Sequence, residues 1–122
     1  MTALYSIDFT LPGLPKSQTN NWTKWARIKD KKRWVQEVWA ATHGKLPKEP
    51  LKSARVHFTR CSATEPDFTN LVASFKHIED ALIEVGLIFD DAPECIGRPG
   101  YAWQKVPPKE GRVRVQVDEL GA

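Results

Sequence analysis

The sequence has no apolar run that approaches the roughly 20 residues of a membrane-spanning helix, so we expect no membrane segment. Its N-terminus lacks the basic stretch and following apolar stretch of a secretory signal, and we therefore expect the protein to stay in the cytoplasm. Cysteine is scarce. Cys61 and Cys95 do not have the paired spacing of a zinc site, and in a reducing compartment they should remain free thiols.

The composition is that of a globular chain. Of the 122 residues, 41% are hydrophobic and 27% are charged, which excludes a largely disordered protein. This length fits one domain with a modest core, and we assign residues 1–122 to a single domain.

Positive charge is concentrated in one segment, although the net charge of the whole chain is only +3. Residues 24–33 contain six basic residues and one acid, a charge of +5, whereas the other 112 residues carry 12 basic and 14 acidic groups, a charge of −2. The basic residues are Lys24, Arg27, Lys29, Lys31, Lys32 and Arg33. Such a segment suits a polyanion such as DNA, although a solvated helix face is the simpler explanation.

Hydrophobic periodicity predicts four strands and two helices. We expect strands over residues 5–11, 54–59, 100–106 and 112–118, and helices over 23–43 and 70–85. The turn at 107–111 fits a hairpin between the last two strands. The order β-α-β-α-β-β predicts an α+β domain with a mixed sheet and helices mainly on one side.

Apolar stripes mark the faces that each helix should bury. In the first helix the stripe is Trp25, Ile28, Val35, Val38 and Trp39. Tryptophans at this spacing are usually core residues, although those beside lysines could also stack on DNA. In the second helix the stripe is Leu71, Phe75, Ile78, Leu82 and Val85. Residues 61–69 read as a polar loop between the second strand and this helix.

Charged residues with potential chemistry surround the second helix. Asp67 precedes it, Lys76 lies within it, and Asp90 and Asp91 follow it. Carboxylates in such loops are typical ligands of Mg²⁺, which stabilises charge on a transferring phosphoryl group and activates water as a nucleophile. A nearby lysine would neutralise the developing negative charge.

Each of these residues also has a purely structural explanation. Asp67 could follow Pro66 in a turn or cap the helix. Lys76 and Asp80 are four residues apart, which is the spacing of an exposed salt bridge. Asp90 and Asp91 could form an ordinary acidic turn before a proline.

The order of these motifs resembles the RusA family of Holliday-junction resolvases. The resemblance rests on Pro66-Asp67-Phe68-Thr69-Asn70-Leu71, then Lys76, then Asp80-Ala81-Leu82, Gly86 and Asp90-Asp91. In that family the same order reads Asp-x-Asp-Asn-Leu, a lysine, Asp-Ala-Leu, a glycine and Asp-Asp. The motifs are short individually but are specific in combination, and the flanking elements extend the resemblance over most of the chain.

The resemblance implies a homodimeric, Mg²⁺-dependent endonuclease, often encoded by phages and prophages, that resolves four-way DNA junctions during recombination and repair. Mn²⁺ would be a possible substitute. Asp67, Lys76 and Asp91 match the catalytic residues; Asp67, Asp90 and Asp91 would hold the metal; Asn70 matches the asparagine at the head of the helix.

One position departs from the family pattern. Thr69 stands where the family has its second aspartate, and a hydroxyl is a weaker Mg²⁺ ligand than a carboxylate. Glu65 or water would then fill the position. The alternative is a non-catalytic protein that binds branched DNA but has lost activity through Thr69. A nuclease for flaps or replication forks is a third hypothesis.

Distance also constrains the predicted site. A helix of about 16 residues is roughly 24 Å long, and four extended residues return only about 13 Å. Asp67 and Asp91 can therefore meet within one chain only if the loop from Cys61 to Thr69 bends back over the sheet. Otherwise the second subunit of a dimer supplies one side of the site.

Overall fold

The computed structural model describes residues 4–16 and 23–121. Strands β1 (Ser6–Pro12), β2 (Ala54–Ser62), β3 (Gly100–Lys105) and β4 (Arg112–Glu119) form a four-stranded sheet in the order β1-β4-β2-β3. Strand β4 is antiparallel to β1 and β2, whereas β2 and β3 are parallel. The predicted mixed sheet is therefore confirmed.

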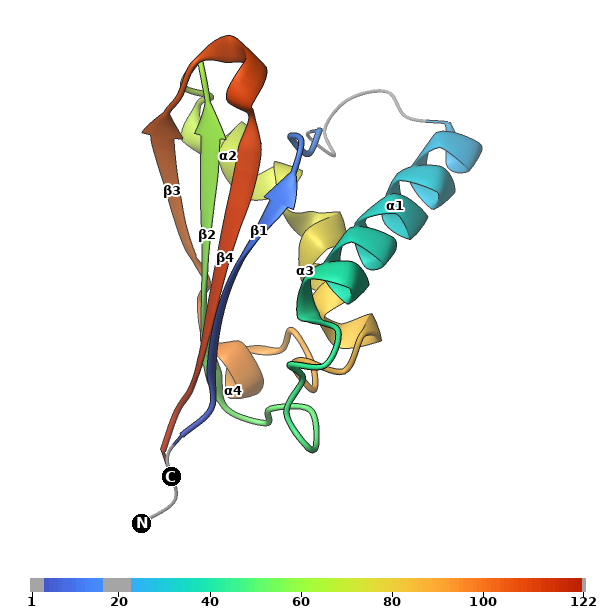
Figure 1. Cartoon of the computed structure of the whole chain (residues 1–122), viewed down its shortest axis with the longest axis vertical. Helices are drawn as coiled ribbons and strands as arrows, with labels where there is room; N and C mark the ends of the chain where they lie inside the picture. The colour runs from blue at the N-terminus through green and yellow to red at the C-terminus, as the bar shows by residue number, and fades with distance from the viewer. Residues whose placement is uncertain (1–3, 17–22, 122) are drawn as a thin grey trace.

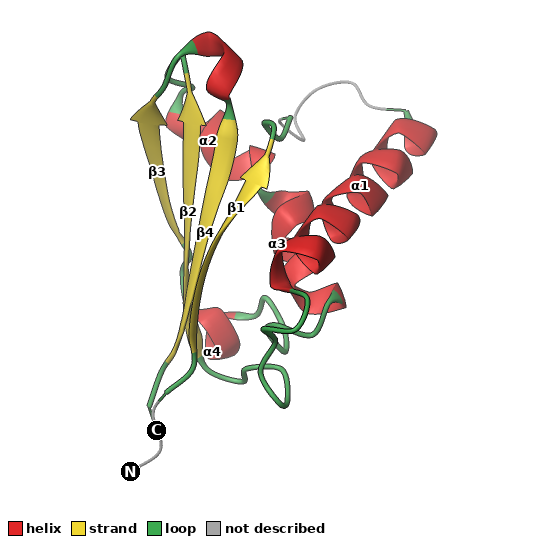
Figure 2. Cartoon of the chain, in the orientation of Figure 1, coloured by secondary structure: helices red, strands yellow, loops and turns green. Residues whose placement is uncertain are grey.

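The helices form a second layer on one face of this sheet (Figure 1; Figure 2 shows the same view by secondary structure). They are α1 (Lys24–Thr42), α2 (Phe68–Ser74), α3 (Lys76–Glu84) and α4 (Pro93–Ile96), with a 3₁₀ turn η1 (Pro108–Glu110) before β4. The domain thus has the predicted α+β class. No helix in residues 4–16 and 23–121 is both long and apolar enough to cross a membrane.

The core lies between the two layers. Alternate residues of the strands point toward the helices, and Phe58 and Val115 are fully buried there. The rings of Phe58, Phe75 and Tyr101 pack together, with centroid separations of 4.8 to 5.8 Å. They join the middle of the sheet to the junction between α2 and α3.

The predicted hairpin between the last two strands is wrong, because β2 lies between β3 and β4. The valines of β4 are buried, so this strand gains most by lying inside the sheet, paired on both edges. The connection instead crosses the end of β2, where the Val106 amide donates to the Ser62 carbonyl oxygen at 3.1 Å. Strand β2 also runs to Ser62, so its end takes up part of the predicted loop 61–69.

The predicted helix over 70–85 is interrupted at Phe75, which has φ −90° and ψ 0°. The Ser74 hydroxyl donates to the Leu71 carbonyl oxygen at 2.8 Å, and the Phe75 amide bonds to the Val72 oxygen, three residues back. These bonds replace the normal helical pattern and divide the segment into α2 and α3. The predicted stripe still lies inward, because Leu71, Phe75, Ile78 and Leu82 are buried.

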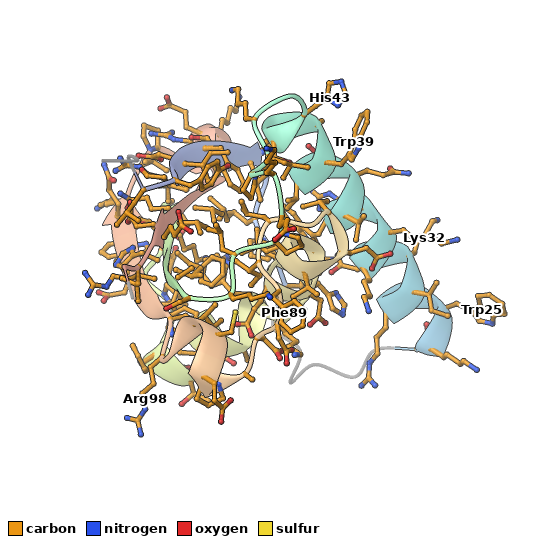
Figure 3. The ribbon with its side chains drawn as sticks, turned by 90° about the horizontal axis from the view of Figure 1, so that it is seen from below. Trp25, Lys32, Trp39, His43, Phe89 and Arg98 are labelled. Carbon is orange, nitrogen blue, oxygen red and sulfur yellow. The ribbon has the colours of Figure 1, made fainter. Side chains whose placement is uncertain are left out.

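The predicted apolar stripe of α1 is only partly correct. Trp34 and Val38 are fully buried, but Trp25 is 78% exposed and Trp39 is 53% exposed. Both exposed tryptophans point away from the domain, as does Lys32 (Figure 3). A helix of 19 residues extends beyond the layer that it covers, so its periodicity predicts the helix better than the buried face.

Candidate active site

Lys76 is the first residue of α3, and two carboxylates converge on its ammonium group. The Nζ atom lies 3.2 Å from Asp80 Oδ1 and 3.1 Å from Asp91 Oδ2. Asp80 is one helical turn away on the same helix, whereas Asp91 comes from the loop after α3. The structure thus brings the lysine and the downstream aspartate of the sequence motif into direct contact.

The loop that carries Asp91 is held by the core. Gly86 has φ +88°, a conformation that glycine adopts without strain, and it turns the chain after α3. Leu87 and Ile88 are then fully buried, and Leu51 bonds through its backbone to Leu87 and Phe89. These contacts place Asp90 and Asp91 beside the first turn of α3.

Charge pairing at this cluster favours the ionised forms. Burial lowers the pKa of Lys76, but hydrogen bonds to Asp91 and Asp80 outweigh it, so that the pKa is raised. The pKa of Asp91 is lowered, mainly by the hydrogen bond from Lys76. Both partners therefore carry charge at neutral pH.

Glu79 belongs to the same cluster and was not among the predicted site residues. Burial raises the pKa of Glu79 to about 7; Lys76 opposes this shift, whereas Asp91 and Asp80 add to it. Glu79 in turn helps burial to raise the pKa of Tyr101 to about 12. Its position one turn after Lys76 was visible in the sequence, but its burial was not.

Asp67 has a different local role. It is the N-cap of α2: its Oδ1 accepts a bond from the Asn70 amide at 2.9 Å, and its Oδ2 accepts one from Asn70 Nδ2 at 2.7 Å. This is the helix-capping explanation that the sequence left open. Glu65, Thr69 and Asn70 are all exposed around it.

The predicted metal ligands Asp67, Asp90 and Asp91 do not form one group. Asp90 is exposed, and its Oδ1 accepts a bond from the Asp91 amide at 2.8 Å. In the part of the chain that the structure describes, no three His, Cys, Asp or Glu side chains are arranged to hold a metal ion. The division at Phe75 leaves Asp67 at the head of one helix and Lys76 at the head of the next.

A smaller set of two carboxylates, Asp80 and Asp91, nevertheless fits one Mg²⁺ ion. Asp80 and Asp91 both reach a single cation, the Lys76 ammonium. Mg²⁺ takes oxygen ligands and is commonly bound by one or two carboxylates, with water and substrate phosphates in the remaining positions. Asp80 and Asp91 could therefore hold the ion between them, without Asp67.

The predicted DNA-binding residues lie on α1, which packs against α3. Lys24, Arg27, Lys29, Lys31, Lys32 and Arg33 are all exposed. The one acid among them, Asp30, points inward, where its Oδ2 lies 2.7 Å from Nδ1 of His77 on α3. This contact leaves the outer surface of the segment positive and holds it beside the helix that begins with Lys76.

No family model and no curated protein matches this chain by sequence.

Proposed function

We propose that this chain is a Mg²⁺-dependent, structure-selective DNA endonuclease that resolves four-way junctions by paired nicks. The observation that carries the proposal is the contact of Lys76 with both Asp80 and Asp91. These positions stand in the order typical of RusA-like resolvases, and they come from two separate segments. A structural salt bridge needs one carboxylate for one lysine, whereas this lysine has two, with Glu79 beside them.

The basic segment of α1 supplies the second support. Six exposed cations on one helix would bind the phosphate backbone and make DNA affinity strongly dependent on salt. Because Asp30 and His77 join α1 to α3, backbone phosphates bound along α1 would lie next to the helix that carries the acids.

In this proposal Asp80 and Asp91 would hold Mg²⁺, which would supply Lewis-acid stabilisation of the scissile phosphate. Lys76 neutralises negative charge that develops on the phosphate. Asp90 fixes the backbone of Asp91 through its side-chain bond. Asp67 and Asn70 hold the head of α2.

A homodimer would place two such sites symmetrically on the junction and produce the paired nicks. We propose that the protein acts in DNA recombination and repair, in the cytoplasm of a bacterial or phage-infected cell.

A second candidate function is binding of branched DNA without cleavage. It is favoured by the capping role of Asp67, whose two oxygens are already engaged by Asn70, and by the exposed hydroxyl of Thr69 in place of an acid. If this function is correct, wild type binds a four-way junction but does not cut it. Restoration of cutting by Thr69→Asp would then identify the missing ligand.

The test is a gel assay with a synthetic four-way junction and Mg²⁺ or Mn²⁺. Wild type should give symmetric nicks, and Asp91→Asn should bind the junction without nicking it. Asp118→Asn is the matched control, because Asp118 is an exposed aspartate on β4 and should retain full cleavage. Binding by wild type and Asp91→Asn with no nicks from either would reject the catalytic proposal. Flap and replication-fork substrates in the same gel show which type of branched DNA the protein prefers to cut.

A further inference from the structure

An arginine occupies the helix-covered face of β2. Val56 and Phe58 are buried on this face, and Arg60 is the next residue on it. The register pairs Arg60 with Val113, which is fully buried on β4. The alternation of the strand therefore calls for an apolar side chain at position 60, but the chain has a half-buried cation there.

This guanidinium has no counter-ion among the residues that the structure describes. Its Nη1 donates to the Pro15 carbonyl oxygen at 2.9 Å, whereas its Nε–H is shielded from solvent and has no hydrogen-bond partner among the described residues. No carboxylate in residues 4–16 or 23–121 forms an ion pair with it. Burial lowers the pKa of Arg60. A half-buried charge with unused donors costs free energy unless a ligand satisfies it.

Arg60 lines a surface pocket of about 470 Å³ between the loop after β1 and helix α2. The other lining residues are Leu14, Pro15, Lys16, Pro66, Asn70 and Ser74. Among the described residues, the pocket lining thus has two cations, an amide and a hydroxyl, and no acid. The Ser74 hydroxyl donates to the Leu71 carbonyl oxygen and Asn70 Nδ2 donates to Asp67, so the two cations are the groups that suit an anion. An arginine fork matches the oxygens of a phosphate.

The pocket is bordered by the head of α2 and, through Lys16, by the basic segment of α1. Asn70 is bonded to Asp67 at the head of α2, so one wall belongs to the sequence motif. Lys16 also lines a neighbouring pocket together with Lys29 and Arg33 of the basic segment. Asp30 lines this pocket as well, but its carboxylate is engaged by His77. Positive side chains therefore follow one another from α1, through Lys16, to Arg60.

We infer that Arg60 and Lys16 bind a backbone phosphate of the same DNA whose neighbouring phosphates lie along the basic segment of α1. This inference rests on the proposed function, because it names a further contact for the same DNA. Arg60 is a binding residue in it, and the charge that is unfavourable in the free protein is neutralised when the strand is bound.

Substitution of Arg60, with a control on the same strand, tests the contact. Arg60→Gln should weaken junction binding about tenfold, the loss expected for hydrogen bonds to a charged group. The slope of log affinity against log salt should fall by about one, as for one lost phosphate contact. The control is Arg55→Gln, because Arg55 is exposed on the opposite face of β2. In this variant the slope of log affinity against log salt should stay closer to that of wild type.

Two further readouts separate a binding role from a structural one. Urea unfolding of Arg60→Gln should show a midpoint equal to or above that of wild type, since the change removes a half-buried charge. Arg60→Lys keeps the charge without the fork and should bind the junction about threefold more weakly than wild type. If Arg60→Gln does not fold, unchanged junction affinity of Arg60→Lys overturns the inference.

A titration of the full chain with inorganic phosphate distinguishes the two proposals. The Nε–Hε resonance of Arg60 should shift with phosphate and remain in place with an equal concentration of chloride. If the protein binds no DNA but this resonance shifts, the proposed function fails and the phosphate pocket stands. If DNA binds and Arg60→Gln has wild-type affinity and salt slope, the pocket inference fails and the proposed function stands.

Discussion

Asp67 and Asp91 lie on either side of the segment that forms α2 and α3, and their carboxylates are engaged differently. Asp67 serves its own helix, with both oxygens bonded to Asn70 three residues later. Asp91 is bonded across a turn of the chain to Lys76, which also holds Asp80. A carboxylate engaged by its neighbour has a local structural role, whereas carboxylates that converge from separate segments make a site.

The difference predicts unequal effects of the same substitution. Asp91→Asn should lower junction cleavage about a thousandfold, the scale of several kcal/mol that a metal ion contributes to transition-state stabilisation. Junction binding should stay within a few-fold of wild type. Cleavage rates under single-turnover conditions measure the effect, and a loss below about tenfold would remove Asp91 from the site.

Lys76→Met should lower cleavage about a hundredfold, since one cationic donor to the scissile phosphate is lost. Lys109→Met, at an exposed lysine in η1, is the control and should have little effect. The variant also releases Asp80 and Asp91 from the lysine, so Mg²⁺ affinity measured by calorimetry should not fall. A lower Mg²⁺ affinity would mean that Lys76 organises the acids rather than contacting the phosphate.

Two substitutions at Asp67 separate capping from catalysis. Asp67→Ala should reduce the free energy of unfolding by about 1 kcal/mol through loss of the N-cap, whereas Asp67→Asn should have nearly no effect on it. Both should retain most of the junction cleavage when folded. If Asp67→Asn strongly lowers cleavage while its stability in urea is unchanged, Asp67 is a metal ligand. Asp67 and Asp91 would then both belong to the site.

Glu79 gives the cluster a pH dependence. Its pKa of about 7 in the folded protein lies above the ordinary value of 4.5, so the folded state binds the proton more tightly than the unfolded state. Its stabilising contribution is complete below about pH 4.5 and is lost as the pH rises to about 7.

Because Glu79 is partly exposed, we expect this loss to be about 0.5–1 kcal/mol. Glu79→Gln should abolish it in urea unfolding at pH 5 and pH 7.5 without divalent cations. Glu84→Gln, at an exposed acid on the same helix, should retain it. If the free energy of unfolding changes equally between pH 5 and pH 7.5 in wild type and Glu79→Gln, Glu79 does not belong to the cluster.

Much of the fold could be predicted from periodicity. The alternation at 5–11 and 112–118 and the helical spacing at 23–43 match β1, β4 and α1 to within one or two residues at each end. These signals are local, because each follows from one face of one element being buried. Pairing between strands is not local, and the position of β3 beside β2 depends on competition among all the strands for the inner places.

The candidate site was predictable in part for the same reason. The order of Lys76, Asp80 and Asp91 was visible in the sequence, and their contact is a geometric consequence of the turn at Gly86. The division at Phe75 goes with local bonds of the Ser74 hydroxyl and the Phe75 amide to carbonyl oxygens, which apolar spacing does not report. Sequence reasoning missed Glu79 and Arg60 because they are candidates only through the burial of a charged side chain, which composition and spacing do not report.

The position of the metal tests the site most directly. Crystals soaked with Mn²⁺ give an anomalous peak at the ion, and we expect that peak between Asp80 and Asp91, with the Lys76 ammonium displaced from them. A peak at Asp67, or no peak in crystals of a protein that cuts junctions with Mn²⁺, would contradict a site built on Asp80 and Asp91.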